Sequence, residues 1–330
     1  MPSLSPVIAE IRLAVRTALS DFPEGSTVIV ALSGGADSLA LAAATAFEAL
    51  KRGIPVTSVT VDHRLQVDSA EVAARAASIA TRLGLEAVVV RVDVDGEGGP
   101  EAAAREARYR VLRDAAAERG ARAVLLGHTL DDQAETVLLG LARGSGAASL
   151  QGMAPSREDE DGLRWLRPLL GVRRETTRAF CAASDLDPWD DPHNVDDRFA
   201  RVRARERVLP VLEAELGPGI AEALARTADQ LREDAEAFDE MIHETIEDIV
   251  EHAEAGISVS VAALAANPAA LRNRIIRLVV DSEFGVSLTR TQTLEVARLV
   301  TDWAGQGPID LPGCAAVRRG GQIVFTASGR

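Results

Sequence analysis

The chain has 330 residues and a hydrophobic fraction of 47%, enough for a substantial core and for about two domains. Its formal net charge of −14 excludes a uniformly basic nucleic-acid coat. No apolar run approaches the roughly 18 residues of a membrane span, and the N-terminus lacks the apolar core of a signal peptide. Cys181 and Cys314 lie too far apart for a thiol metal motif. We therefore expect a cytoplasmic protein without a membrane partner.

The first half of the chain alternates strand-like and helix-like segments. Strands are predicted at residues 27–31, 56–61, 87–92 and 123–126, and a helical pattern follows each of them. This alternation predicts a parallel sheet with helices on both faces, which is a doubly wound α/β fold. In such sheets ligands bind beyond the carboxyl ends of the strands.

The second half has a different pattern. A polar loop at 155–162 interrupts the alternation, and Gly217-Pro218-Gly219 predicts a domain boundary. Helical patterns and then a short β-like end follow, at 220–254, 268–281, 289–301 and 307–327. We predict one α/β domain over 1–216 and a second, mainly helical substrate-binding domain over 217–330.

A six-residue string, Ser33-Gly34-Gly35-Ala36-Asp37-Ser38, stands directly after the first predicted strand and directly before a helix. The glycines let the backbone turn tightly against a phosphate, and the N–H groups at the helix start favour an anion. Ser33 and Ser38 add hydroxyl donors, and Asp37 can hold a magnesium ion that bridges phosphates. The alternative is a generic turn in which Ser33 or Asp37 caps the helix. The Walker A ending and the G-x-G-x-x-G spacing are both absent from this string.

This string resembles the phosphate loop of the N-type ATP pyrophosphatases, also called PP-loop proteins. Members of that class cleave ATP between the α and β phosphates and activate a substrate oxygen as its adenylate. The resemblance implies an ATP site formed by Ser33, Gly34, Gly35, Ala36, Asp37 and Ser38.

Four further strings carry a closer resemblance. They are residues 61–63 (Val-Asp-His), 104–109 (Ala-Arg-Glu-Ala-Arg-Tyr), 127–146 (beginning Gly-His-Thr-Leu-Asp-Asp) and 191–205 (beginning Asp-Pro-His-Asn). In order and spacing they resemble the tRNA(Ile)-lysidine synthetase family over residues 25–215. The sequence departs from that family at Gln66, where arginine is usual, at His193, where serine is usual, and at Val202, where asparagine is usual.

The string at 127–146 also has a purely structural explanation. Thr129 and Asp132 have the spacing of a helix capping box. That box does not account for His128. It also does not account for Asp131 and Glu135, which share one helix face at i and i+4. A helix start rich in carboxylates would repel phosphates unless a cation intervened, so bound magnesium fits.

The other candidate residues have alternatives as well. His63 could be an ordinary histidine at a strand end. Arg105 and Arg108 could belong to a solvated helix face, and Tyr109 could be a core residue. On a helix, Arg198, Arg201 and Arg205 would fall at i, i+3 and i+7. Such a basic stripe suits phosphate oxygens of RNA or of ATP.

The resemblance implies a ligase that forms a carbon–nitrogen bond on the wobble cytidine of tRNA(Ile) with anticodon CAU. The C2 oxygen of the cytidine attacks the α phosphate of ATP, and free lysine then displaces AMP. The expected catalytic residues are Asp37, His128, Asp131, Asp132 and Arg143. The expected nucleoside contacts are Asp62, His63 and Gly127; the expected RNA or phosphate contacts are Arg105, Arg108, Arg198, Arg201, Arg203 and Arg205; the expected Mg²⁺ ligands are Asp37, Asp131 and Glu135.

Two rival interpretations remain from the sequence. One is another PP-loop enzyme that adenylates tRNA. A glutamine-fed enzyme of this class would need a catalytic cysteine, and an iron–sulfur enzyme would need paired cysteines; Cys181 and Cys314 provide neither. The other is a sensor that holds ATP without turning it over. A basic stripe and a second domain both argue against a bare sensor. The C-terminal helices could provide a homodimer surface.

Overall fold

The computed structural model describes residues 5–64, 66, 68–93, 100–144, 146–253 and 256–328. The chain forms two compact units, Met1–Arg232 and Glu233–Arg330. This division falls within the long helix α10 (Ile220–Ile249), beyond the Gly-Pro-Gly turn at which the sequence suggested a boundary. The assignment of domains and of their roles stays a prediction.

A six-stranded sheet forms the centre of the first unit. Its strands are β1 (Val28–Ala31), β2 (Val56–Asp62), β3 (Glu86–Arg91), β4 (Ala123–Leu125), β5 (Ser156–Glu158) and β6 (Arg164–Leu166). They are arranged in the order β3-β2-β1-β4-β6-β5, and only the edge strand β5 is antiparallel to its neighbour. Val28, Ile29 and Val30 of β1 are fully buried, as expected for a strand covered on both faces.

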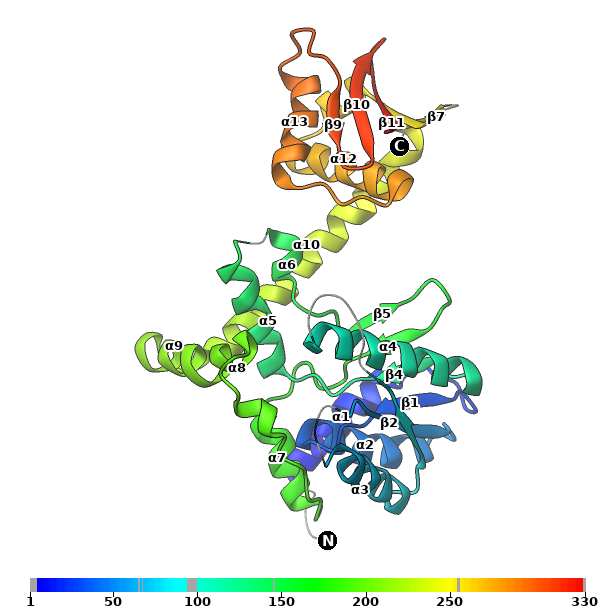
Figure 1. Ribbon diagram of the computed structural model, residues 1–330, viewed down its shortest axis with the longest axis vertical. Helices are drawn as coiled ribbons and strands as arrows, with labels where there is room; N and C mark the ends of the chain where they lie inside the picture. Colours follow the sequence, from blue (N-terminus) through cyan, green and yellow to red (C-terminus); the bar gives the residue numbers. More distant parts are fainter. Residues whose placement is uncertain are drawn as a thin grey trace. The chain divides into compact units, whose positions relative to one another are not determined.

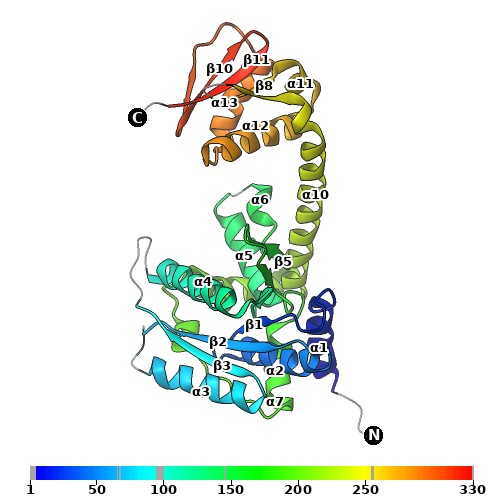
Figure 2. The same ribbon diagram turned by 90° about the vertical axis from the view of Figure 1, so that its right-hand side faces the viewer.

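Helices cover both faces of this sheet, and two of those in the first unit, α5 and α6, extend beyond it. They are α1 (Pro6–Ala18), α2 (Ala36–Leu50), α3 (Ser69–Arg82), α4 (Pro100–Arg119), α5 (Leu130–Ala142), α6 (Ala147–Leu150) and α7 (Arg174–Ala183). Helices α2 and α3 lie on one face and α4 on the other, with α7 packed beside α1 and α2 (Figures 1 and 2). The predicted doubly wound α/β fold is confirmed.

The segment between α7 and α10 is less regular than the sheet region. It contains a 3₁₀ turn (Pro192–Val195), helix α8 (Ala200–Arg203), a π-helical turn (Ala204–Val208) and helix α9 (Leu209–Leu216). Arg198 precedes α8 and pairs with Asp196, so Arg198 does not share a helical stripe with Arg201 and Arg205. The polar loop predicted at 155–162 contains the strand β5.

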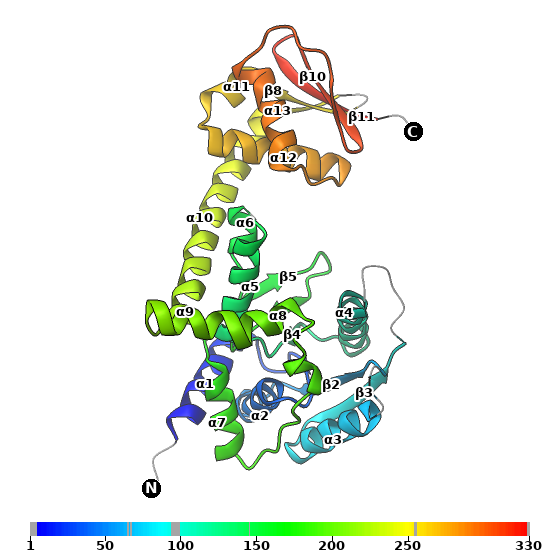
Figure 3. The same cartoon turned by 60° about the vertical axis from the view of Figure 1, so that its left-hand side comes forward.

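The second unit holds more strand than its sequence suggested. Its elements beyond α10 are β7 (Val250–Ala253), β8 (Gly256–Ser260), α11 (Val261–Ala266), α12 (Ala269–Phe284), α13 (Arg290–Thr301), β9 (Ile309–Leu311), β10 (Cys314–Arg319) and β11 (Gln322–Ala327). The strands form an antiparallel sheet in the order β7-β8-β11-β10-β9. Helices α11, α12 and α13 pack on one face of it around a buried core (Figure 3). Within the described part of the chain, no helix is both long enough and apolar enough to cross a membrane.

Candidate active site

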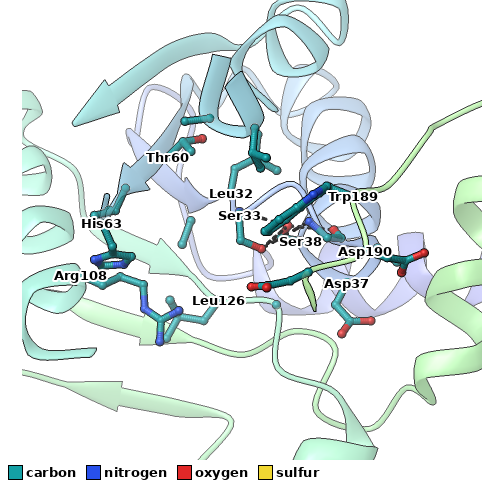
Figure 4. A pocket seen from close by; sticks show the side chains of 18 of the residues that line it. Leu32, Ser33, Asp37, Ser38, Thr60, His63, Arg108, Leu126, Trp189 and Asp190 are labelled. Atoms are coloured by element: carbon teal, nitrogen blue, oxygen red, sulfur yellow. Dashed lines mark hydrogen bonds between the residues drawn. The ribbon is translucent and has the colours of Figure 1, made fainter. Parts of the chain in front are cut away.

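A cavity of about 730 Å³ opens at the carboxyl ends of β1, β2 and β4 in the first unit. The predicted site residues that line it are Ser33, Gly35, Ala36, Asp37, Ser38, Asp62, His63, Arg108, Gly127, His128, Asp132 and Arg205. The predicted residues that do not line it are Gly34, Arg105, Asp131, Glu135, Arg143, Arg198, Arg201 and Arg203. Figure 4 shows the phosphate-loop residues Ser33, Asp37 and Ser38 on one side of the cavity and His63 and Arg108 on another.

The loop between β1 and α2 is held by its own hydroxyl groups. The Ser38 hydroxyl donates to the Gly35 carbonyl at 2.9 Å and accepts the Ser33 N–H at 3.2 Å. Gly34 has a φ of +90°, a conformation that L side chains rarely adopt. Gly35 is the N-cap of α2 and has no side-chain cap, so N–H groups at this helix start are available to an anion.

Gly127 lets the loop after β4 approach the start of α2. A Cβ atom on Gly127 would lie 3.2 Å from the Ser38 N and Cα atoms, and backbone there cannot give way as a side chain tip would. We expect Gly127→Ala to displace the phosphate loop and to weaken ATP binding at least about tenfold, a loss of about 1.4 kcal/mol. Calorimetric ATP titration measures this. Gly171→Ala is the control, because nothing lies within 4 Å of its Cβ position; equal ATP affinity in both variants would contradict the expectation.

Asp37 faces the cavity from the first turn of α2. The Thr177 hydroxyl donates to the Asp37 carboxylate, and the Arg174 Nε lies 3.5 Å from its other oxygen. Burial raises the pKa of Asp37, while Thr177 and Arg174 oppose that rise. The carboxylate is a quarter exposed, and Asp37 stands in the first turn of α2, directly after the loop. A carboxylate whose charge is poorly solvated next to a phosphate site favours a cation between the two.

Arg174 joins carboxylates from two helices. Its guanidinium pairs with Asp132 at 2.6 Å and Glu135 at 3.2 Å as well as with Asp37, and its backbone N–H donates to Asp131 at 2.7 Å. Burial alone would lower the pKa of Arg174, but Asp132, Glu135 and Asp37 raise it, so the side chain stays cationic. Arg174 and Thr177 are not among the site residues predicted from the sequence. The available signal was the Arg173-Arg174 pair at the start of an amphipathic helix.

The capping box predicted at the start of α5 is confirmed. The Asp132 carboxylate accepts the Thr129 N–H at 2.8 Å, and the Thr129 hydroxyl accepts the Asp132 N–H at 3.4 Å. Burial acts to raise the pKa of Asp132, but Arg174 and the Thr129 N–H outweigh it and lower the pKa. Asp132 is therefore an ionised carboxylate with both oxygens engaged.

His128 stands at the end of β4 and lines the cavity. Its buried Nδ1 has no hydrogen-bond partner among the described residues. Burial, opposed by Asp132 and reinforced by Arg167, lowers its pKa to about 4. The imidazole is thus neutral near pH 7 and can accept a hydrogen bond or a proton.

Acidification should destabilise the fold through His128. The unfolded chain binds a proton on this imidazole below about pH 6.5, whereas the folded chain does so only near pH 4. The unfolding free energy therefore falls as the pH drops between these two values. We expect the unfolding midpoint to fall further between about pH 7 and about pH 5 in the wild type than in His128→Asn. Equal falls in scanning fluorimetry would contradict this.

His63 and Arg108 form one wall of the cavity (Figure 4). Burial lowers the pKa of His63, and the neighbouring Arg108 lowers it further. The His63 Nδ1 is buried without a partner in the described structure. Asp62 is 3% exposed and accepts the Arg64 N–H at 3.0 Å, so it shapes the end of β2. Arg64 itself has a φ of +56°.

Several predicted residues do not line the cavity. Glu135 is fully buried; Arg205 donates to both of its oxygens at 2.7 and 3.1 Å, and Arg201 lies 3.7 Å from it. Arg203 donates to the Asp197 and Arg198 carbonyl groups. Arg143 is exposed at the C-cap of α5. Arg105 lies over the Tyr109 ring, 5.0 Å from its centroid, and Tyr109 itself packs against Trp165 and lines the cavity.

Trp189 is a further cavity residue that the sequence did not identify. Its backbone N–H donates to the Gly34 carbonyl at 2.9 Å. This hydrogen bond ties the segment before the 3₁₀ turn to the phosphate loop. Figure 4 shows its ring beside Ser33 and Ser38. It is one of three tryptophans in the chain, but nothing in its local sequence indicates this contact.

The three predicted magnesium ligands do not converge. Asp131 pairs with Arg173 at 3.2 Å, Glu135 pairs with Arg174 and Arg205, and Asp37 alone of the three lines the cavity. Over the described ranges, no three His, Cys, Asp or Glu side chains form a metal-binding group. Asp37 still fits a magnesium ion that is held by one carboxylate, substrate phosphates and water, which is the usual coordination of Mg²⁺ at phosphate sites.

Comparisons with known proteins agree with this geometry. A family model described as a PP-loop domain matches residues 9–212, and one described as a TilS substrate binding domain matches residues 260–324. The U34-tRNA thiolase NcsA from Methanococcus maripaludis shares the fold, with a TM-score of 0.60 at 19% identity, covering 69% of this chain and 79% of that one. The fold and the phosphate loop thus define a PP-loop enzyme that uses ATP.

Closer relatives narrow the class. The tRNA(Ile)-lysidine synthase of Leifsonia xyli subsp. xyli is 60% identical over 91% of this chain and 90% of its own length. That of Thermobifida fusca is 49% identical over 98% of both chains. The chain belongs to the tRNA(Ile)-lysidine synthase family, whose members are ligases that form a carbon–nitrogen bond.

Proposed function

We propose that the chain ligates lysine to C2 of the wobble cytidine of tRNA(Ile) with anticodon CAU. In the first step, the C2 oxygen of the cytidine forms a bond to the α phosphorus of ATP, and the bond to the β phosphate breaks, releasing pyrophosphate. In the second step, the ε-nitrogen of lysine bonds to C2, the C2–oxygen bond breaks, and AMP leaves. The amine gives up a proton. Both tRNA and free lysine are cytoplasmic, so the reaction would take place there.

One observation carries this proposal. The phosphate loop and Asp37 share a single cavity with a wall formed by the neutral His63 and the cationic Arg108, and with the charged cluster around Arg174. Adenylation depends mainly on positioning and on neutralising charge, so a loop of N–H donors facing that wall suits its first step.

The residues around the loop would divide the work of adenylation. The Ser33–Ser38 loop would hold the phosphates, and Asp37 would hold Mg²⁺, which supplies charge neutralisation at the phosphates when it is bound. Arg108 would face the phosphates or the RNA from the opposite wall, since burial lowers its pKa but leaves a guanidinium cationic at neutral pH.

The second step needs a lysine site and a proton acceptor. Asp132, Arg174 and Arg205 line the cavity with alternating charge, which suits the ammonium and carboxylate groups of an amino acid. His128 would accept a hydrogen bond from the amine and orient it, because its Nδ1 is unpartnered among the described residues and it is neutral near pH 7; its pKa of about 4 makes it only a weak proton acceptor. Asp131 is a weaker candidate, since Arg173 and the Arg174 N–H already engage its carboxylate.

Pyrophosphate release tests the proposal. Purified chain would be given ATP, magnesium and tRNA(Ile) bearing CAU, with and without lysine. Release that requires this tRNA supports the adenylation step. Release that requires a different tRNA would indicate another PP-loop modification, and ATP binding without release would indicate a sensor.

A further inference from the structure

The cavity contains an aromatic ring that phosphate binding does not require. Trp189 is partly exposed and lines the cavity, and Figure 4 shows its ring beside the phosphate-loop residues Ser33 and Ser38. Phosphates are bound by N–H groups, hydroxyl groups and cations, to which the face of an indole ring contributes little. An apolar ring left facing solvent gives up the free energy of its burial, so a ligand that covers the ring gains that free energy.

Trp189 has no stacking partner within the described part of the chain. The described lining of the cavity holds two aromatic residues besides histidine, Tyr109 and Trp189. The ring of Tyr109 is already occupied: it packs against Trp165 with 4.9 Å between the ring centroids, and the Arg105 guanidinium lies 5.0 Å from its centroid. Among the described residues, no aromatic ring or guanidinium stacks on Trp189 in this way, so its ring is available to a planar ligand.

The segment that carries Trp189 is fixed to the rest of the first unit. Hydrogen bonds hold residues 187–191; they join Asp187 to Arg75 at 2.8 Å, the Trp189 N–H to the Gly34 carbonyl at 2.9 Å, and Asp191 to Gln66 at 2.9 Å. The bond to Gly34 uses the backbone of Trp189, so it remains possible when the side chain is replaced. Because the ring is fixed before a ligand arrives, little conformational entropy is lost on binding.

Two bases enter the cavity in the proposed reaction, the adenine of ATP and the wobble cytosine of the tRNA. Figure 4 shows His63, an expected nucleoside contact, and Trp189 on opposite sides of Ser33. Ala31 of β1 and Val61 of β2 also line the cavity and offer the adenine apolar side chains at the strand ends. The cytosine has to reach the phosphates from the anticodon loop. Bases of single-stranded RNA loops are readily unstacked and held on aromatic side chains.

We propose that the Trp189 ring stacks on the wobble cytosine and holds its C2 oxygen near the phosphate loop. The identity of the base rests on the proposed function, and Trp189 adds to that function the residue that positions the base for adenylation. Stacking does not read hydrogen-bonding groups. Trp189 therefore positions the pyrimidine ring, and the choice of cytosine is left to polar groups of the cavity.

A double-mutant cycle on the ring and the base tests this contact. tRNA(Ile) bearing CAU and the same tRNA without its wobble base are titrated into each protein, with α,β-methylene ATP present so that no pyrophosphate is released. In the wild type, we expect loss of the base to weaken binding at least about tenfold, the scale of one base–aromatic stack. In Trp189→Leu the two RNAs should bind within about twofold of each other, and Trp189→Phe should lie between. Phe47→Leu removes a 42% exposed ring of α2 that does not line the cavity, and it should behave as the wild type.

Each protein is compared with itself on two RNAs, so partial unfolding of a variant cancels. An equal effect of the base in the wild type and in Trp189→Leu would overturn the contact, and so would a wild type that binds both RNAs equally. Weaker binding of α,β-methylene ATP to Trp189→Leu, with an unchanged effect of the base, would overturn it in favour of adenine. Coupling between ring and base in a chain that never incorporates lysine would support the contact and overturn the proposed reaction. Incorporation of lysine without coupling would overturn the contact alone.

Discussion

Asp37→Asn should lower tRNA-dependent pyrophosphate release at least about 100-fold, the scale of losing one electrostatic contact at a reacting centre. Asparagine keeps the shape of the side chain and can still accept the hydrogen bond from Thr177. It loses the negative charge that would hold magnesium at the phosphate loop. The defect should therefore lie in turnover rather than in folding.

Steady-state rates of pyrophosphate release by the wild type and by Asp37→Asn measure this loss of turnover, with ATP varied at saturating tRNA. Asp114→Asn serves as control, because Asp114 is an exposed aspartate on α4. Turnover within about threefold of the wild type in Asp37→Asn would remove Asp37 from the reaction.

Arg174→Gln should produce the other large effect. It removes the cation shared by Asp37, Asp132 and Glu135, and the repulsion among these carboxylates would then move Asp37 away from the loop. We expect turnover to fall about 100-fold. The unfolding free energy should fall by about 2 kcal/mol, less than breaking an isolated buried pair costs, because Arg205 still neutralises Glu135.

Two further variants make this test specific. Arg174→Lys restores the charge but not the fork geometry, so it should recover part of the turnover. Arg12→Gln breaks another ion pair of the first unit, Arg12 with the nearly buried Glu48 at 2.7 Å, far from the cavity. That change should lower stability but leave turnover within about twofold. Equal loss of activity in Arg12→Gln and Arg174→Gln would mean that Arg174 acts only through stability.

The parts of the site that were predicted from the sequence are those made by local chain. The phosphate loop lies within six consecutive residues between a strand and a helix, and the Thr129–Asp132 box spans a single helical turn. The parallel sheet likewise follows from alternating patterns and a general rule of topology. Each of these features depends on residues that are close together in the sequence, so the sequence alone predicts it.

The features that were missed depend on contacts between distant segments. Thr177 and Asp37 are 140 residues apart, and Trp189 reaches the loop only because its segment folds back against Gly34, in the loop that follows β1. Strands β5 and β6 are three residues long, too short for an alternating pattern to appear; β4 is equally short but fully buried and apolar, whereas β5 is fully exposed. The carboxylate-rich start of α5 suggested Asp131 and Glu135 as magnesium ligands in addition to Asp37 of the phosphate loop. The sequence could not show that arginines from α7 and the π-helical turn already bind these two carboxylates.

Incorporation of radiolabelled lysine into tRNA tests the central claim most directly. The chain would be incubated with ATP, magnesium, labelled lysine and tRNA(Ile) bearing CAU, and in parallel with the same tRNA in which the wobble cytidine is changed to guanosine. The proposed function predicts label in the CAU tRNA alone, accompanied by equal amounts of AMP and pyrophosphate. Pyrophosphate release without label in the CAU tRNA, or label in both tRNAs, would contradict it.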